Sequence, residues 1–236
     1  MRYHLITLGL APLLLLQGRK VRRDTPLLPE PEGEREGSAG QGRDLRLLIL
    51  GDSAAAGVGA AHQGEALSGR LVEALGEDYR VHWRLSAATG HRTRDLLARL
   101  AATEAQAFDV VVISVGVNDA TGGTGREAWL TELAQLLDAI RERHSAGLVV
   151  FSGLPPMHLF PALPQPLRWY MGLRARRLNE TLAAFAARHP DCAVAVPDFP
   201  LDTACLASDG FHPGPLAYAE WARHLAALIR RRQKRE

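Results

Sequence analysis

Five short runs rich in apolar residues recur along the chain, and each is followed by a longer amphipathic stretch. The apolar runs lie at 45–50, 79–85, 109–114, 147–153 and 192–196. Strands that lack polar alternation are typical of parallel sheets covered on both faces. The amphipathic stretches have helical spacing and lie at 65–75, 93–103, 126–143, 173–189 and after Pro215. The pattern therefore predicts an α/β fold, a three-layer α/β/α sandwich with a five-stranded parallel sheet.

The length and charge of the chain agree with a single folded unit. The 236 residues, 47% of them hydrophobic, suffice for one domain with a full core. Basic residues are concentrated at 19–23 and 230–235, and the rest of the chain is close to balanced, so the sequence gives little support to a nucleic-acid function. We expect an N-terminal segment at 1–23, a linker at 24–44, which is rich in Pro, Gly and Glu, and the folded domain at 45–236.

The N-terminal segment combines an apolar run at 5–16 with a basic cluster at 19–23. The run is too short to span a bilayer, and no typical cleavage site separates it from the basic cluster. We favour an uncleaved anchor that contacts a membrane surface through residues 1–23, which would make the protein membrane-associated. A degenerate signal peptide for a secreted or periplasmic protein and an apolar arm folded back onto the domain are the alternatives. The oligomeric state stays open.

The only two cysteines, Cys192 and Cys205, lack the spacing of a zinc cluster. Two buried thiols are the simpler interpretation, and a single disulfide in an oxidising compartment is the alternative. The histidines also lack metal-ligand spacing, so no metal site is predicted.

Polar residues and glycines follow the predicted strands, where the reactive groups of parallel sheets collect. Ser53 follows the first apolar run, Gly90 the second and Asn118 the third, whereas Asp209 and His212 lie between the fifth run and the last helix. These segments are therefore expected to meet at one edge of the sheet.

The residue types at this edge match the needs of nucleophilic catalysis by a serine. A serine hydroxyl needs a base to take its proton, and a carboxylate orients that base. Two residues, Gly210 and Phe211, separate Asp209 from His212 in SDGFHPG, so a tight turn can bring the carboxylate to His212 Nδ1 while Nε2 faces Ser53. The Asn118 amide and the Gly90 backbone N–H can stabilise an oxyanion. Taken singly, each motif could be a helix cap or a surface turn.

Taken together, Gly51-Asp52-Ser53, Gly90, the GVND motif that holds Asn118, and the DGFH motif resemble the signature blocks of the SGNH, or GDSL-type, hydrolases. The resemblance covers about residues 45–230 and implies a flavodoxin-like SGNH hydrolase fold and a serine esterase without cofactors. It implies Ser53, His212 and Asp209 as the catalytic triad, and the Ser53 N–H, Gly90 and Asn118 as the oxyanion hole. Ala54 departs from the leucine of the GDSL name, at a packing position.

Several functions agree with this resemblance. We favour hydrolysis of carboxylic esters with short to medium acyl chains, which makes a small-molecule or lipid ester the expected partner. A thioesterase or lysophospholipase with the same triad is one alternative, and a non-catalytic, membrane-attached binding domain is another.

The segment at 154–172 is rich in proline and large apolar residues, which suits a semi-rigid wall for an acyl chain. The predicted substrate-binding residues in it are Met157, Leu159, Phe160 and Trp169. The segment could instead cover the core or help the N-terminal segment contact a membrane. The helical positions of Trp129 and Trp221 indicate core residues. Asp52 and Asp119 are expected to hold their loops through hydrogen bonds to the backbone.

Overall fold

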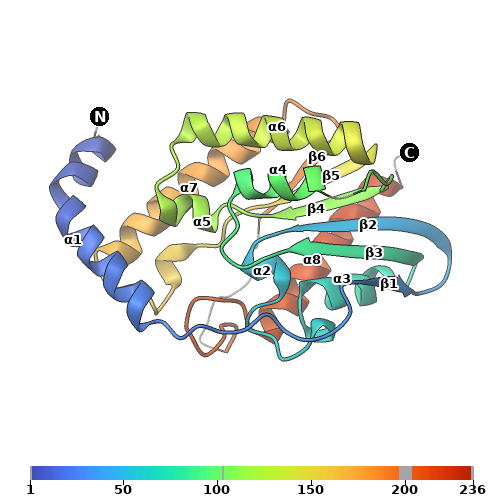
Figure 1. The fold of residues 1–236 in the computed structure, drawn as a ribbon, viewed down its shortest axis with the longest axis horizontal. Coiled ribbons are helices and arrows are strands. Elements are labelled where there is room, and N and C mark those ends of the chain that lie inside the picture. Colours follow the sequence, from blue (N-terminus) through green and yellow to red (C-terminus); the bar gives the residue numbers. More distant parts are fainter. Residues whose placement is uncertain (1, 103, 197–203, 235–236) are drawn as a thin grey trace.

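A six-stranded sheet with the order β1-β3-β2-β4-β5-β6 forms the centre of the computed structural model, which describes residues 2–102, 104–196 and 204–234 (Figure 1). The strands are β1 (Glu36–Ala39), β2 (Arg43–Gly51), β3 (Tyr79–Ala87), β4 (Val110–Ser114), β5 (Leu148–Ser152) and β6 (Cys192–Ala195). The helices are α1 (Arg2–Asp24), α2 (Ser53–Ala56), α3 (Leu67–Leu75), α4 (Thr93–Ala102), α5 (Val117–Gly122), α6 (Arg126–His144), α7 (Leu167–Ala186) and α8 (Pro215–Gln233), and the single 3-10 turns are η1 (Gln63–Glu65) and η2 (Met157–Leu159).

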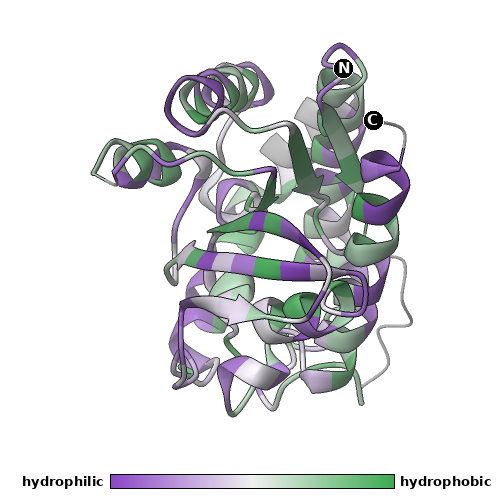
Figure 2. Cartoon of the chain, turned by 90° about the vertical axis from the view of Figure 1, so that its right-hand side faces the viewer, coloured by the Kyte–Doolittle hydropathy of each residue, from purple (hydrophilic) through white to green (hydrophobic). Residues whose placement is uncertain are grey.

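Helices cover both faces of the sheet, so successive strand residues enter two different cores. Leu48 and Leu50 of β2 pack in the core beneath α4, α6 and α7, whereas Leu47 and Ile49 pack in the core beneath α3 and α8. This explains why the central strands read as unbroken apolar runs, since both faces of each strand are buried. In Figure 2 the strands in the upper part of the sheet are green throughout, whereas the strands that cross the middle of the view are banded in purple and green.

The five apolar runs form β2 to β6, and all five strands are parallel, which confirms the α/β/α sandwich. The strand count is the difference, because β1 adds a sixth, antiparallel strand beside β3. This strand lies inside the segment that the sequence suggested as a linker, 24–44, and β2 likewise begins before Leu45. All four residues of β1 are exposed and it pairs only with β3, so it has no apolar pattern to detect.

The strand order positions the site. The chain passes from β2 to its neighbour β3 through α3 on one face, and then crosses back to β4, on the other side of β2, through α4 on the opposite face. The loops after β2 and β4 therefore diverge and leave a crevice at the carboxyl ends of these strands. Such a reversal is where open α/β sheets bind ligands.

The second half of α1 packs against the domain. Leu14 is buried in the core that also holds α7, and Leu10 and Val21 contact the same core. The Gln17 side chain donates a hydrogen bond to the Gln165 carbonyl and accepts one from the Leu167 N–H. For these residues the structure matches the alternative of an arm folded back onto the domain. No helix in the described part of the chain is long and apolar enough to cross a membrane, and contact with a membrane surface stays a prediction.

The two cysteines lie on different segments. Cys192 is buried in β6, and Cys205 lies in the segment that leads to the DGFH turn. No disulfide joins them. Cys192 is buried, as the simpler interpretation expected of both thiols, whereas Cys205 is partly exposed.

Candidate active site

Ser53 lies at the sharp turn between β2 and α2. Asp52 caps α2, because its Oδ1 accepts a hydrogen bond of 3.1 Å from the Ala54 N–H. The Asp52 N–H in turn donates to the Ser114 carbonyl, which ties the end of β2 to the end of β4. The turn holds Ser53, which is partly exposed, at the carboxyl edge of the sheet.

A tight turn brings Asp209 and His212 to Ser53. His212 Nε2 lies 2.9 Å from Ser53 Oγ, and His212 Nδ1 lies 2.5 Å from Asp209 Oδ2. The other oxygen, Asp209 Oδ1, accepts hydrogen bonds from the backbone N–H groups of Phe211 and His212. Gly210 adopts a φ of +63°, in the left-handed region that glycine tolerates best. The three residues thus form one continuous line of hydrogen bonds, in the order that the sequence suggested.

The chain that follows His212 packs closely against the loop after α2. The Tyr218 hydroxyl, from the first turns of α8, donates a hydrogen bond of 2.7 Å to the Val58 carbonyl. At Gly59, where φ is +102°, a Cβ atom would lie 2.2 Å from the Pro213 carbonyl oxygen. The small residues after Ser53 therefore allow the segment that carries His212 to approach it closely.

Two buried carboxyl groups of the site, those of Asp209 and Asp52, differ in their pKa. Burial alone would raise the pKa of Asp209, but the hydrogen bonds from the His212 imidazole and from two backbone N–H groups outweigh it and hold this pKa below its ordinary value. Burial raises the pKa of Asp52 to about 7, against a weaker opposing effect of the Ala54 N–H and His212. Asp209 is thus kept as a carboxylate that can orient an imidazole, whereas Asp52 takes up a proton far more readily.

We expect Asp52→Asn to stabilise the protein increasingly as the pH rises. A carboxyl with a pKa of about 7 in the folded state and 3.8 as its ordinary value binds more protons when folded, so its contribution to the free energy of unfolding is lost as the pH rises through this range. The asparagine oxygen can still cap α2. Urea unfolding of both proteins at pH 5 and pH 8 should give a difference that grows by about 3 kcal/mol in favour of the variant.

A difference that stays constant between pH 5 and pH 8 would contradict this prediction, because Asp52 would then bind protons equally in the folded and unfolded states. A difference that shrinks would indicate that the folded protein favours the Asp52 carboxylate. Far-ultraviolet circular dichroism at both pH values serves as the control that the folded states are alike.

Two of the three residues predicted for the oxyanion hole, Gly90 and Asn118, lie on neighbouring loops. Gly90 is exposed on the loop after β3 with a φ of +84°, and Asn118 is the second residue of α5, after β4. The Asn118 Nδ2 donates a hydrogen bond of 2.9 Å to the His91 carbonyl, which links the two loops. An amide nitrogen carries two hydrogens, so this contact uses one of them.

Asp119 holds the same loops from inside the protein. It is fully buried, and its Oδ2 accepts hydrogen bonds from the N–H and the hydroxyl of Thr93. Its Oδ1 accepts one from the Thr124 hydroxyl. As the sequence suggested for both Asp52 and Asp119, these carboxyl groups bind their loops, and neither contacts the His212 imidazole in the hydrogen bonds that the structure describes.

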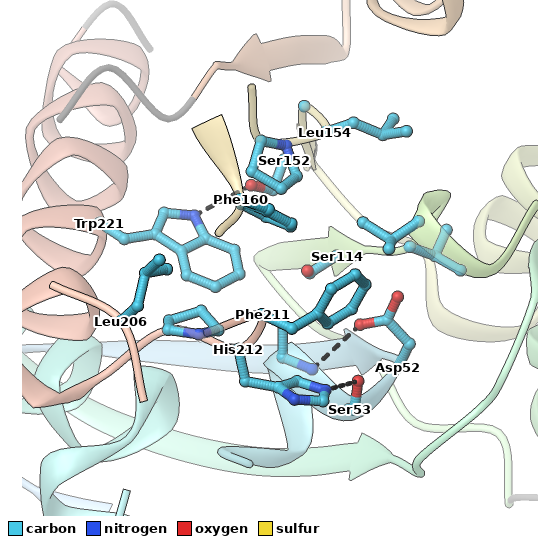
Figure 3. Close-up of a pocket in the computed structure, with 16 residues that line it drawn as sticks. Asp52, Ser53, Ser114, Ser152, Leu154, Phe160, Leu206, Phe211, His212 and Trp221 are labelled. Atoms are coloured by element: carbon cyan, nitrogen blue, oxygen red, sulfur yellow. Dashed lines mark hydrogen bonds between the residues drawn. The ribbon is translucent and has the colours of Figure 1, made fainter. Parts of the chain in front are cut away.

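A pocket of about 60 Å³ opens beside Ser53 (Figure 3). It lies over the ends of β4 and β5, and its lining is mostly apolar. The lining residues are Asp52, Ser53, Ala54, Ser114, Val115, Val117, Ser152, Gly153, Leu154, Pro155, Phe160, Leu206, Phe211, His212, Pro213 and Trp221. Among the described residues no group of three or more His, Cys, Asp or Glu side chains could hold a metal ion.

Only one of the four predicted substrate-binding residues lines this pocket. Phe160 does so, with its ring against the ring of Phe211. Met157 is fully buried in the core, Leu159 is exposed without lining this pocket, and Trp169 lines a separate surface groove behind Leu154. The 154–172 segment forms η2 and the start of α7, so its large residues point in several directions instead of forming one wall.

Other residues that line the pocket had not been predicted to bind substrate. Trp221, which was expected in the core, does pack there but also lines the pocket. Val115 directly follows β4 and Leu154 is the second residue after β5, so the strand-end rule that selected the polar residues could have selected them too.

Comparison with known proteins connects this arrangement to characterised sequences. The sequence model of the GDSL-like lipase/acylhydrolase family matches residues 49–220. A GDSL-like esterase of Mycobacterium tuberculosis, Rv1075c, is 31% identical over 189 residues, which cover 75% of this chain and 59% of that protein. The chain thus matches less than two thirds of the length of this relative.

Solved structures share the fold. An extracellular lipase from Streptomyces rimosus is 22% identical, with a TM-score of 0.57 over 78% of this chain and 99% of that one. The psychrotrophic esterase EstA from a Pseudoalteromonas species, inhibited by monoethylphosphonate, is 18% identical, with a TM-score of 0.63 over 80% and 98% of the two chains. At these identities the likeness establishes the fold alone.

Proposed function

Because this chain belongs to the GDSL-like lipase/acylhydrolase family, we propose that it hydrolyses carboxylic esters through an acyl-enzyme intermediate on Ser53. One observation carries the proposal: the hydrogen bonds that run from Ser53 Oγ through His212 to Asp209. A helix cap or a surface turn does not require that a serine and a histidine 159 residues apart lie 2.9 Å from each other.

In the proposed first step, the neutral His212 imidazole takes the Ser53 proton at Nε2 while Oγ attacks the acyl carbonyl carbon. The tetrahedral intermediate collapses when His212 returns this proton to the leaving alcohol oxygen and the carbon–oxygen ester bond breaks. The Asp209 carboxylate accepts the Nδ1 hydrogen throughout, which fixes the tautomer and stabilises the imidazolium that forms.

We assign the stabilisation of the negative charge that develops on the carbonyl oxygen to three N–H donors. These are the backbone N–H of Ser53, the backbone N–H of Gly90 and the Asn118 hydrogen that is not donated to His91. The resemblance to the family supports their roles, and the hydrogen bond between Asn118 and the His91 carbonyl supports the proximity of Asn118 to the loop that holds Gly90. Donors of this kind typically contribute about 10²–10³ in turnover each.

In the second step a water molecule takes the place of the alcohol. His212 removes a proton from this water, the resulting hydroxide attacks the acyl carbon, and the proton passes to Ser53 Oγ as its bond to the acyl group breaks. The products are a carboxylic acid, an alcohol and the restored serine. Apart from the ester and water, the cycle needs only groups that the chain itself provides.

A fluorophosphonate probe tests the proposal directly, because it reacts with activated serines and not with ordinary ones. We expect one phosphonyl group per chain, located on Ser53 by mass spectrometry of the digested protein. Ser38→Ala, which removes an exposed hydroxyl of β1, should be labelled like the unchanged protein. Absence of label, or label on another serine, would contradict the assignment and revive a non-catalytic role.

A further inference from the structure

The pocket beside Ser53 has an open end and a closed end. Ser53 and His212 are partly exposed, whereas Trp221, Ser152 and Leu154 are at most 5% exposed. In Figure 3, Trp221, Ser152 and Leu154 lie on the opposite side of the pocket from the paired Ser53 and His212. The pocket therefore extends from the reacting atoms into the protein.

Trp221 forms a well-supported part of the closed end. Its Nε1 donates a hydrogen bond of 2.9 Å to Ser152 Oγ, which joins α8 to the end of β5. Its ring also stacks on Tyr218, with the ring centroids 6.2 Å apart and the planes 14° from parallel. Because both the ring and its polar atom have fixed partners, the indole cannot move aside at low cost to admit a longer ligand.

The volume of the pocket limits what it can hold. A water-sized group occupies about 10–15 Å³ by this measure, so 60 Å³ holds roughly four to six such groups. A cavity that binds benzene measures about 150 Å³. The pocket thus fits an aliphatic chain of about two to four carbons, and an octanoyl chain is too long for it.

The order of events in ester hydrolysis favours the acyl group as the occupant. The alcohol must leave and water must replace it while the acyl group stays bonded to Ser53, so the alcohol needs a route open to solvent. A closed apolar pocket suits the group that stays. Its apolar walls, including Val115 and Phe160, also match an aliphatic chain, which loses no hydrogen bonds when it is buried.

We propose that this pocket binds the acyl chain of short-chain esters and that Trp221 sets the upper limit of chain length. The inference rests on the proposed function and deepens it. It narrows the substrates to esters of acids with about four carbons or fewer, and it assigns a specificity role to a residue of α8.

Two substrate series test the inference. The first varies the acyl chain of p-nitrophenyl esters from acetate through butyrate to octanoate, and the second varies the alcohol of acetate esters from methyl to octyl. The unchanged protein should lose at least tenfold in kcat/KM between butyrate and octanoate. Trp221→Leu should raise the octanoate-to-butyrate ratio by at least tenfold, because each methylene group newly buried contributes about fourfold.

Two further variants keep the test decisive. Leu154→Ala widens the same end of the pocket without touching the hydrogen bond between Trp221 and Ser152, and it should shift the ratio in the same direction if Trp221→Leu folds poorly. Phe185→Leu replaces a buried ring with the same aliphatic side chain, but in the core away from the pocket, and it should leave the ratio unchanged.

The outcomes separate the two proposals. If the unchanged protein hydrolyses none of the esters, the proposed function fails and this inference fails with it. If it hydrolyses them but Trp221→Leu and Leu154→Ala leave the acyl ratio as it was, only the inference is overturned. A change confined to the alcohol series would assign the pocket to the leaving group and would also overturn it.

Discussion

Ser53→Ala is expected to lower kcat for p-nitrophenyl acetate by about 10⁶-fold, the loss typical of a nucleophile removed from a serine triad. The Ser53 hydroxyl contacts His212 Nε2, and its removal leaves the acyl carbonyl without an attacking atom in reach. Any remaining rate would come from the proposed oxyanion donors acting on water. Steady-state kinetics with purified protein measure the effect.

The same substitution should leave the fold unchanged, because alanine is well accepted in the first turn of α2 and the backbone contacts of this turn do not involve the side chain. Thermal unfolding followed by circular dichroism checks this, and Ser38→Ala serves as a control with full activity. An Ser53→Ala variant that folds normally and keeps more than one hundredth of the activity would exclude Ser53 as the nucleophile.

Asp209→Asn is expected to lower kcat by about 10⁴-fold. Asp209 uses one oxygen for two backbone N–H groups and the other for His212 Nδ1. The asparagine oxygen would keep the backbone contacts, so its NH₂ group would face Nδ1. This favours the imidazole tautomer with its hydrogen on Nε2, which donates to Ser53 where it should accept.

Asp191→Asn is the matched control, because Asp191 is a partly buried carboxylate paired with Arg141 and takes no part in the site. It should change kcat by less than about twofold, although it weakens an ion pair. A loss of less than tenfold in Asp209→Asn would contradict the orienting role, and it would indicate that His212 keeps its working tautomer without the carboxylate.

The parallel part of the fold could be predicted because burial on both faces leaves a trace in the sequence. The strands β2 to β6 and helices such as α6 follow from apolar runs and helical spacing. In contrast, β1 forms because β3 offers an unpaired edge to a passing segment, so the cause lies in the partner strand and not in Glu36–Ala39 themselves. Its residues also match a linker, and periodicity could not tell the two apart.

The proposed catalytic residues could be predicted for a different reason. Ser53, Asp209 and His212 are polar types at strand ends or in a tight turn, where few structural needs select that combination. The pocket could not be predicted, because Trp221 at a helical core position and Phe160 among other apolar residues have the same pattern whether their rings meet neighbours or a cavity. The prediction that Met157, Leu159 and Trp169 bind substrate rests on the composition of their segment. Composition does not specify the direction in which a side chain points.

The hydrogen bond between Tyr218 and Val58 has a consequence for biosynthesis. The ribosome makes Ser53 early and His212 about 159 residues later, and α8 follows both. A nascent chain can pair β2, β3 and β4 long before the imidazole exists, so its serine stays unreactive. Hydrolytic activity would then first arise when α8 docks, which would make it a direct readout of completed folding rather than of chain length.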